Sequence, residues 1–369
     1  MASLAFLPKP VAELPWRMLI LVIGIAAFST LVLYSAADGH MYWALPQAMR
    51  FAVFFAMAIA MSWLRPAWIK QAAFPAYVII LFMLLFVEAL GFVGGGAQRW
   101  LNLGFINLQP SELMKPVIVL ATAHFYALLP AREIRGWSAL WPAGLLIGIP
   151  AALILIQPDL GTATMVVLGG VTIMFLAGVP LRLFAGAVAA AAVILPIALS
   201  FLHDYQRQRV LIFLNPEADP LHSGYHITQS KIAIGSGGLV GNGFLQGTQS
   251  RFSFLPEKHT DFIFATMAEE WGLLGGLFLI ASFALILHWG MRVASESRDR
   301  FSRLAAAGLT TTIFFYVAIN LMMVMGLAPV VGIPLPLFSY GGSAMMTVMI
   351  CLGLLMAIER QNRRDARKA

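Results

Sequence analysis

The chain has 369 residues, of which 60% are hydrophobic and only 11% are charged, and its mean hydropathy is +0.83. About a quarter of the residues of an ordinary soluble domain are charged, so this composition excludes a soluble globular protein and indicates one embedded in a lipid bilayer. The net charge of +7 fits a basic rim facing anionic lipid headgroups, and no sequence motif supports nucleic-acid binding.

The apolar residues fall into ten continuous stretches, each close to the roughly 20 residues that a helix needs to cross a bilayer. A transmembrane β-barrel would instead show weaker, alternating segments of about ten residues. The sequence therefore predicts an all-α integral membrane protein with about ten transmembrane helices, forming one membrane domain over residues 1–369. The expected helices cover residues 16–36, 43–63, 74–93, 108–129, 137–156, 160–178, 181–202, 262–289, 304–327 and 336–358.

Basic residues concentrate on alternate connections between these stretches, and lysine and arginine near span ends are retained in the cytoplasm. The short loops of the opposite set contain only Arg99. We therefore expect both termini in the cytoplasm, with residues 359–369 forming a basic cytoplasmic tail. The first apolar stretch lacks a convincing small-residue cleavage site, so we interpret it as a span and not as a signal peptide.

Two oppositely charged residues, Glu112 and Lys115, occur at the start of the fourth stretch, in the segment "NLQPSELMKP". Their spacing of three places them on one helical face, where they can neutralise each other. Charges inside a membrane are costly, about 3 kcal/mol at a helix centre. The pair is therefore either a structural ion pair or, as we favour, a polar wall of a substrate cavity.

Asp159 lies at the entrance to the sixth stretch, in "QPDLGTAT". A carboxylate at this position suits the N-terminus of a helix as a cap. It also suits a binding site on the outer face, and the sequence leaves both roles open.

Residues 203–261 form one long extracytoplasmic loop before the eighth stretch. Loops of this length are usually functional or disordered, and the aromatic residues in this one argue against disorder. Residues 225–243 predict a short amphipathic helix ended by glycines. These glycines are not followed by Gly-Lys-Ser/Thr, so they do not form a nucleotide-binding P-loop.

The segment "FLPEKHTDFIFATMAEEWG" places six ionisable side chains at the entrance to the eighth stretch. Asp261 can be explained as a first-turn carboxylate. The concentration of further ionisable residues around it, Lys258, His259, Glu269 and Glu270, instead favours a functional site. For His259 we favour a structural, hydrogen-bonded role over a proton relay.

The segment "PLFSYGGS" contains Ser339 and Ser343 beside glycines that let helices approach closely. We favour packing over substrate contact for these serines. The single cysteine, Cys351, is expected to be a small buried residue. The seven histidines include no recognised ligand motif, so a zinc site is not expected.

Five long segments occur in the order "GGAQRWLNLGFINLQPSELMKP", "QPDLGTA", "HSGYHITQSKIAIGSGGLVGNG", "FLPEKHTDFIFATMAEEWGLLGG" and "PLPLFSYGGS". Together they resemble the SEDS family of bacterial cell-wall proteins, which includes RodA, FtsW and SpoVE. The resemblance runs from about the first span to the last. The basic Lys258 is more similar to the RodA branch, which serves cell elongation, than to the FtsW branch, which often has a small residue there.

The resemblance implies a peptidoglycan glycosyltransferase that polymerises lipid II at the outer face of the cytoplasmic membrane, with Asp261 as an essential residue. The donor linkage is α and the product linkage is β, so the reaction inverts and needs one carboxylate as base. Asp261 is the candidate base. The expected substrate-binding residues are Glu112, Lys115, Asp159, Arg99, Arg207, Arg209, Lys258, His259, Glu269, Glu270, Ser339 and Ser343.

The cations among these residues would stabilise the leaving diphosphate. A magnesium or manganese ion could bridge the diphosphate and a carboxylate, because hard oxygen ligands suit these ions, but the sequence shows no dedicated metal cage. The resemblance implies lipid II, a class B penicillin-binding protein and other elongation proteins as partners. Two alternatives remain, a lipid II flippase and a non-catalytic scaffold.

Overall fold

The computed structural model describes residues 13–90, 92–94, 97–102, 107–198, 223–251, 254–255 and 257–368. Within these residues the chain is mainly helical, and each of the ten expected stretches coincides with one long helix. The helices are α2 Trp16–Ala36, α3 Ala44–Met61, α4 Pro66–Leu90, α5 Pro110–Leu128, α6 Trp137–Ile156, α7 Leu160–Ala177, α8 Leu181–Ala198, α10 Ser223–Ser236, α11 Thr248–Arg251, α12 Ile263–Glu296, α13 Arg300–Val324 and α14 Gly342–Lys368.

Eight of the described helices are long and apolar enough to cross a membrane by length and composition. The two expected spans outside this group are α5 and α8. The N-terminal half of α5 contains Glu112 and Lys115, and the apolar part of α8 is the shorter segment Leu181–Ala190. The all-α membrane fold is therefore confirmed, while the count of ten crossings stays a prediction.

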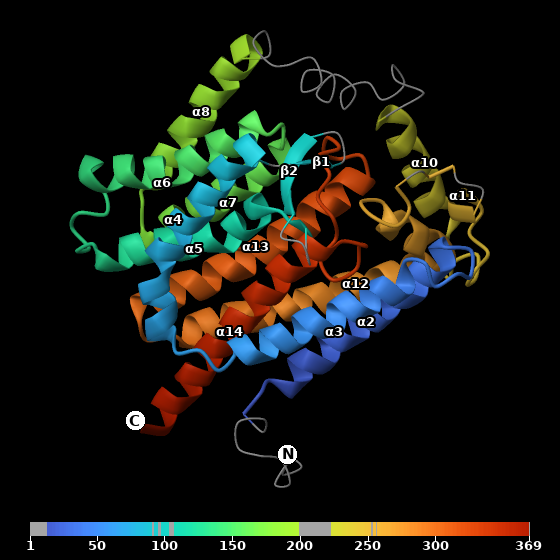
Figure 1. Ribbon diagram of the computed structural model, residues 1–369, viewed down its shortest axis with the longest axis horizontal. Helices are drawn as coiled ribbons and strands as arrows, with labels where there is room; N and C mark the ends of the chain where they lie inside the picture. The colour runs from blue at the N-terminus through green and yellow to red at the C-terminus, as the bar shows by residue number, and fades with distance from the viewer. Residues whose placement is uncertain are drawn as a thin grey trace.

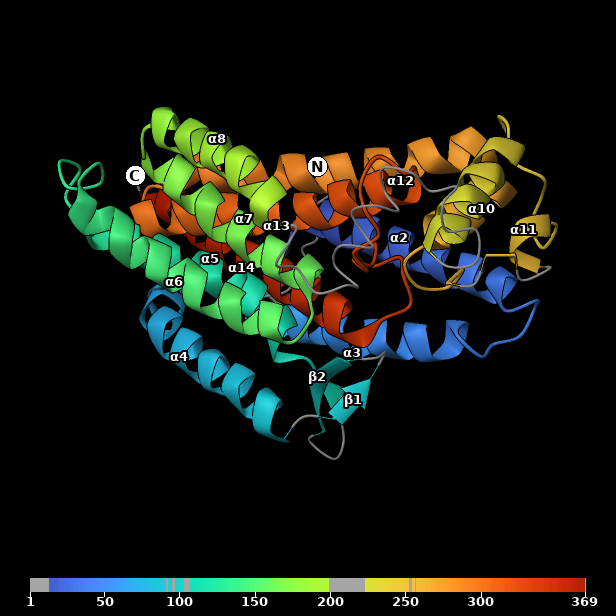
Figure 2. The same ribbon diagram turned by 90° about the horizontal axis from the view of Figure 1, so that it is seen from above.

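The helices form one bundle in which segments distant in the sequence are neighbours (Figure 1). Helix α14 packs against α3, α12 packs against α13 and α2, and α5 packs against α4 and α7. Figure 2 shows α3 and α4 on one side of the molecule and α8 and α12 on the opposite side. The short helices α10 and α11 lie at the end of the bundle opposite the C-terminal end of α14 (Figures 1 and 2).

The outer surface of the bundle exposes large apolar side chains, as expected where lipid replaces water. Ile20, Val53 and Val188 are each more than 60% exposed. Polar residues instead enter the interior, where Glu112, Lys115 and Glu270 are all at most 5% exposed. This distribution fits a protein whose solvent is hydrocarbon.

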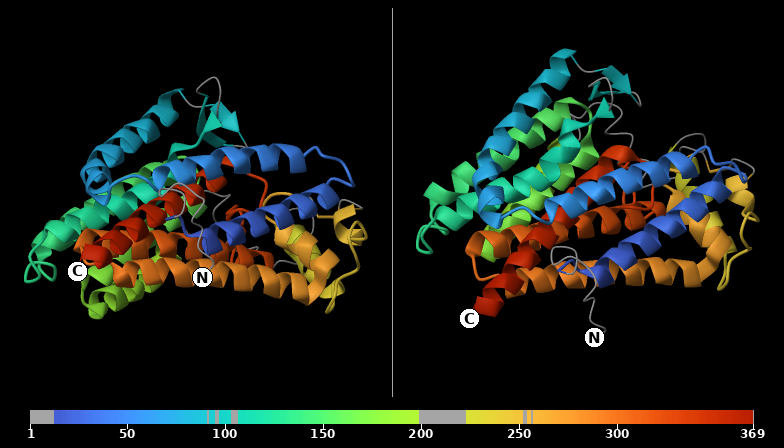
Figure 3. Two further views of the ribbon diagram at one scale, coloured as in Figure 1. Left: turned by 90° about the horizontal axis from the view of Figure 1, so that it is seen from below. Right: turned by 60° about the horizontal axis from the view of Figure 1, so that its bottom comes forward.

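A small antiparallel sheet, absent from the sequence prediction, follows α4. It comprises β1 Phe92–Gly94, β2 Ala97–Asn102 and β3 Asn107–Leu108 in the order β1-β2-β3. The third stretch was expected to stay helical to residue 93, but α4 ends at Leu90. Figure 3 shows the sheet beside the C-terminal end of α4. As a result, β2 carries Arg99 and Trp100 back toward the bundle.

Helix α12 is kinked at Gly272, where φ is +60° and ψ is −158°. The segment 237–243, which we call the glycine wedge, enters this kink. The amides of Asn242 and Gly243 donate to the carbonyls of Glu269 and Glu270, at 2.9 and 3.1 Å.

Two further bonds complete the wedge on the other side of the kink. The amides of Leu273 and Leu274 donate to the carbonyls of Gly238 and Leu239, at 2.9 and 3.2 Å. The wedge thereby satisfies main-chain groups that the kink releases, which a bilayer could not do. The amphipathic helix expected over 225–243 was therefore too long, because α10 ends at Ser236 and the glycines after it form the wedge.

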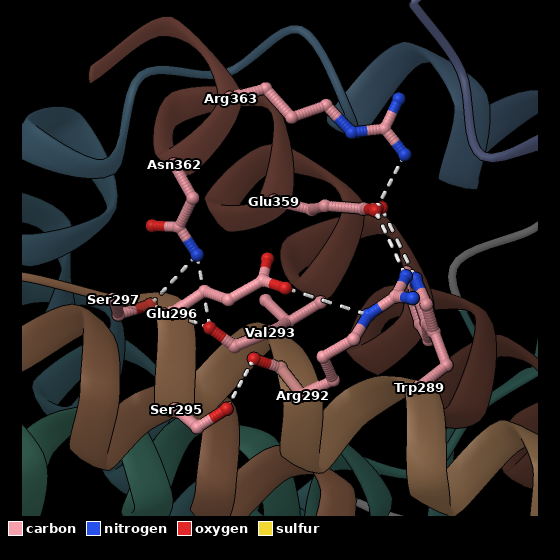
Figure 4. Close-up of polar contacts among 9 residues, drawn as sticks. All are labelled: Trp289, Arg292, Val293, Ser295, Glu296, Ser297, Glu359, Asn362 and Arg363. Carbon is pink, nitrogen blue, oxygen red and sulfur yellow. Dashed lines mark hydrogen bonds and ion pairs between the residues drawn. The ribbon is translucent and has the colours of Figure 1, made fainter. Parts of the chain in front are cut away.

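The C-terminal end of α14 is fixed to α12 through the buried carboxylate of Glu359 (Figure 4). This carboxylate accepts hydrogen bonds from Trp289 Nε1 at 3.2 Å and from Arg363 at 2.6 Å. It also lies 3.7 Å from the guanidinium of Arg292. Asn362 adds hydrogen bonds to α12 one turn further along.

The described start of the chain lies against the same end of α14. Glu13 accepts hydrogen bonds from Arg360 at 3.3 Å and from Arg367 at 3.1 Å. Partial burial acts to raise the pKa of Glu13, but these arginines and Arg364 lower it overall. Residues 359–368 of the expected basic tail continue α14 as a helix, since arginine and lysine are good helix formers, and the cytoplasmic location of the tail stays a prediction.

Candidate functional site

Asp261 lies two residues before α12, whose N-cap is Phe262. The expected role as a first-turn carboxylate is therefore wrong, because the helix begins one residue later than predicted and has no acidic residue in its first turn. The side chain of Asn320 donates to the carbonyls of Asp261 and Ile333, at 2.9 and 2.7 Å. This amide fixes the backbone of Asp261 to the loop that joins α13 and α14.

The Asp261 carboxylate faces the α13–α14 loop, residues 325–341. A Cβ atom placed on Gly332 would lie 3.5 Å from its Oδ2. Gly332 has a φ of +71°, a conformation that favours glycine. Asp261 is only partly buried, so the carboxylate is positioned by its neighbours and still reaches the surface.

The α13–α14 loop is held in place by Ser339, one of the expected substrate-binding residues. Its hydroxyl accepts a hydrogen bond from the Leu335 amide at 2.8 Å. Its carbonyl accepts another from the side chain of Gln47 on α3, also at 2.8 Å. These contacts match the packing role favoured for Ser339, whereas Ser343 lies in the first turn of α14 and lines a groove described below.

Asp159 is the N-cap of α7, and its Oδ1 accepts a hydrogen bond from the Thr162 amide at 3.1 Å. The side chain of Gln109 donates to its Oδ2 at 3.2 Å, and Arg99 lies 3.9 Å from the same oxygen. The capping role left open by the sequence is therefore present. Asp159 also lies near the α13–α14 loop, because a Cβ atom placed on Gly161, two residues further on, would lie 2.6 Å from the Val331 carbonyl oxygen.

Glu112 and Lys115 form a buried ion pair of 2.5 Å. The Lys115 ammonium also donates to the Tyr316 hydroxyl at 2.9 Å, and that hydroxyl donates to Glu112. Thr347 on α14 donates to the Glu112 carbonyl at 3.2 Å. The charges thus neutralise each other inside the bundle, and any role in substrate binding stays a prediction.

Glu269 and Glu270 point away from Asp261, toward the loop that precedes α12. Glu269 accepts hydrogen bonds from the Thr248 hydroxyl at 3.0 Å and from the Gln249 amide at 2.8 Å. It therefore fixes the start of α11. Glu270 accepts a hydrogen bond from Ser35 on α2.

Lys258 and His259 face the segment that follows the C-terminal end of α2. The Lys258 ammonium lies 3.8 Å from the Asp38 carboxylate. The His259 ring stacks on Trp43 with ring centroids 4.1 Å apart. Burial lowers the pKa of His259; the Glu257 charge opposes this effect, and the Lys258 charge acts in the same direction as burial.

An open cavity of about 570 Å³ lies beside these residues. Its lining includes Asp38, His40, Trp43 and Lys258. The His259 carbonyl also accepts a hydrogen bond from the Tyr340 amide at 2.9 Å, so the segment before Asp261 is tied directly to the end of the α13–α14 loop.

A groove of about 640 Å³ lies between α3, β2 and the N-terminus of α14. Its polar residues are Arg50, Tyr340 and Ser343, and the Arg50 guanidinium lies over the Tyr340 ring at 4.6 Å. Its apolar lining comes from Met49, Val53, Phe54, Trp100 and Met346.

The sequence analysis missed Arg50 and Trp100. The signal for Arg50 was present, because an arginine inside an apolar stretch is costly and points to a function. Trp100 carried no comparable signal. Arg207 and Arg209 lie outside the described residues. Among the described residues, no group of three or more histidine, cysteine, aspartate or glutamate side chains could hold a metal ion.

The fold and the site define a polytopic helical membrane protein with a partly exposed carboxylate and a groove lined by polar and apolar residues, both in contact with the α13–α14 loop. The chain belongs to the FtsW, RodA and SpoVE family, whose model, described as "Cell cycle protein", matches residues 12–364.

The chain is similar to curated members of this family along nearly its whole length. It is 43% identical to the peptidoglycan glycosyltransferase MrdB of Escherichia coli K12, covering 92% of each chain. It is 30% identical to the peptidoglycan glycosyltransferase RodA of Treponema pallidum, covering 95% of this chain and 98% of that relative.

Solved structures share the fold. One belongs to a study of how a peptidoglycan synthase complex coordinates polymerization and crosslinking; its TM-score is 0.83 at 32% identity, covering 95% of this chain and 99% of that one. The crystal structure of RodA from Thermus thermophilus has a TM-score of 0.69 at 27% identity, covering 95% and 97%.

Proposed function

We propose that this chain is a peptidoglycan glycosyltransferase of the elongation type, which polymerises lipid II at the outer face of the cytoplasmic membrane. The enzyme class is supported by relatives that bear this name and that match the chain over nearly its full length. The site is supported by one observation above the others: Asp261 is positioned by Asn320 and Gly332 and yet remains partly exposed.

In this proposal Asp261 is the general base. Its carboxylate takes the proton from the 4-hydroxyl of the acceptor sugar while that oxygen attacks the anomeric carbon of the donor. The bond from that carbon to the lipid diphosphate breaks, and the configuration inverts. General bases contribute about 10²- to 10⁴-fold to rate, so removing this carboxylate should nearly abolish polymerisation.

The groove beside Arg50 suits the lipid diphosphate. Arg50 supplies a guanidinium for the phosphate oxygens, and the first turn of α14 supplies amides and the Ser343 hydroxyl. The apolar lining suits the hydrocarbon chain of the carrier. The groove thus provides a polar part for the diphosphate and an apolar part for the hydrocarbon chain of an amphiphilic substrate. Ser339 or Asp159 alone would not provide both.

In this proposal a magnesium or manganese ion would enter the site bound to the diphosphate of the substrate. The described residues supply no protein cage, and Asp261 is the carboxylate that would contribute one ligand, with the remaining ligands coming from phosphate and water. Such an ion would neutralise charge on the leaving group. We expect chelation to slow polymerisation, and an undiminished rate in a chelator would remove the ion from the proposal.

A class B penicillin-binding protein is the proposed partner, since one structural neighbour belongs to a complex that couples polymerization with crosslinking. Other elongation proteins and the surrounding lipids complete the proposed setting. The orientation, with Asp261 facing outward, rests on the distribution of basic residues in the loops.

A flippase is the alternative from another functional class. It would need polar residues along a path through the membrane. The charged residues deepest in the described bundle, Glu112 and Lys115, pair with each other and are at most 5% exposed. This arrangement favours the transferase.

The test is glycan polymerisation from purified lipid II, with the partner present and its transpeptidase inactivated. We expect Asp261→Asn to lower the rate at least about a hundredfold. The matched control is Glu257→Gln, because Glu257 is an exposed carboxylate four residues away and should be dispensable. Equal rates for the wild-type chain and Asp261→Asn would exclude Asp261 as the base, and a chain that moves lipid II across vesicles without polymerising it would favour the flippase.

A further inference from the structure

A second, smaller polar cavity lies near the outer end of α2, apart from the groove and from Asp261. It has a volume of about 130 Å³. It is lined by Ser35, Asp38, Leu245, Gly247, Arg251 and Glu270. None of these residues has a part in the proton transfer or in diphosphate binding described above.

The cavity contains a buried carboxylate. Glu270 is 2% exposed, and its Oε1 accepts a hydrogen bond from Ser35. Its Oε2 is buried without a well-directed hydrogen bond within the described ranges of the chain, although the backbone of Leu245 and Gly247 lies close enough to the carboxylate to interact with it. Leaving such an oxygen unsatisfied costs free energy, so a positively charged donor in the cavity would stabilise it.

The other charged groups at the cavity have both signs. Asp38 adds a second carboxylate, which Lys258 partly balances at 3.8 Å. Arg251, an exposed residue at the end of α11, adds a guanidinium. Glu269 accepts hydrogen bonds from Thr248 and Gln249 of α11, and its charge also acts on Glu270. A ligand that carries an ammonium and a carboxylate together would match this pattern.

The size of the cavity limits the ligand. A water molecule takes about 30 Å³ of liquid volume, so the cavity has room for about four waters or for one amino-acid head group. The cavity is also near the reaction site, because the nine steps along the chain from Asp261 to Glu270 are mostly helical and span roughly 13 Å.

We propose that this cavity binds the zwitterionic end of an amino-acid side chain in the peptide of the lipid-linked substrate, with its ammonium at Glu270 and Asp38 and its carboxylate at Arg251. This inference rests on the proposed function. A diamino dicarboxylic acid residue ends in such a zwitterion, whereas a simple diamino acid ends in an ammonium alone. The cavity would therefore select substrates by the chemistry of their peptide.

The test is equilibrium binding of lipid II variants to the full chain carrying Asp261→Asn, in lipid nanodiscs, so that no turnover occurs. The three probes are lipid II with the free zwitterionic side chain, the same molecule with this amine acetylated, and the same molecule with this carboxylate amidated. We expect each modification to weaken binding about tenfold, as loss of a charge-assisted hydrogen bond would.

Two variants assign these preferences to the cavity. Adding Glu270→Gln should remove the preference for the free amine, and adding Arg251→Gln should remove the preference for the free carboxylate. Ser35→Ala gives a second, milder change at the amine side if Glu270→Gln does not fold. Glu257→Gln is the control that should retain both preferences.

Equal binding of the three probes would overturn the inference, and so would an amine preference that survives Glu270→Gln. Polymerisation by the wild-type chain is measured in parallel. An active polymerase without peptide selectivity would leave the proposed function intact, whereas a chain that binds none of the probes would contradict both.

Discussion

Gly272 and Gly241 touch backbone to backbone: a Cβ atom on Gly272 would lie 2.4 Å from the amide nitrogen of Gly241. This contact is the centre of the glycine wedge, and it lets a loop enter the body of a long helix. The wedge positions the carbonyls and side chains of Glu269 and Glu270 at the outer end of the bundle.

Gly241→Ala should therefore destabilise the protein. The new Cβ would lie 2.0 Å from the Glu270 carbonyl oxygen, and Gly241 has a φ of +85°. Overpacking of this kind typically costs about 1–3 kcal/mol. We expect a lower midpoint of thermal unfolding in detergent and reduced polymerisation. Gly235→Ala, in α10, is the control, since no atom lies within 4 Å of its new Cβ; if both variants unfold at the same temperature as the wild-type chain, the wedge is not structurally important.

Removing one partner of the buried ion pair should be more harmful than removing both. Lys115→Met leaves the Glu112 carboxylate buried without its cation, which typically costs about 3–5 kcal/mol. The double variant Glu112→Gln, Lys115→Met leaves no buried charge and should recover much of this loss. Thermal unfolding of the wild-type chain and the two variants measures the effect, and a double variant no more stable than Lys115→Met would show that the buried charge of Glu112 does not cause the loss.

Arg50→Met should weaken lipid II binding. The substitution removes the guanidinium over Tyr340 but keeps an apolar side chain of similar length in the groove. We expect the KM for lipid II to rise about tenfold or more, in line with a charge-assisted contact, with a smaller change in kcat. Arg65→Met is the matched control, because Arg65 stacks on Trp68 outside the groove. An unchanged KM for Arg50→Met would place the diphosphate elsewhere.

His259 should make the protein less stable at low pH. Burial lowers its pKa below the ordinary value of 6.5, so the unfolded chain binds this proton more readily than the folded chain does. Stability from this residue is therefore present above pH 6.5 and is lost as the pH falls below it. The difference in unfolding midpoint between pH 8 and pH 5.5 should be smaller in His259→Gln than in the wild-type chain; an identical difference would show that His259 does not titrate on unfolding.

The sequence predicted the helices well because continuous apolar runs of about 20 residues have few alternatives in a bilayer. The sequence also indicated Asp261 as a candidate site residue, because several charged residues lie close to it in the chain. It could not show the glycine wedge, because the contact between Gly241 and Gly272 joins segments 31 positions apart, and glycines after a helix look like an ordinary helix end.

The remaining differences have similar causes. The sheet after α4 is built from the short, partly apolar segment 92–108, which has no clear strand alternation. The groove depends on α3, β2 and α14 meeting in space, which no spacing along the chain reveals. Helix α14 continues beyond residue 358, where the expected span ends, because charge ends a membrane span but does not end a helix.

Helices α12 and α14 are joined near both of their ends. Glu359 connects them at one end, and the bond from the Tyr340 amide to the His259 carbonyl connects the segments that begin them at the other. Because α12 and α14 are joined at two places, neither helix can slide along the other without breaking one of these contacts. A force applied at the C-terminal end of α14 would therefore move α12 and α14 together, and the separation between Asp261 and the groove at their opposite ends would be kept.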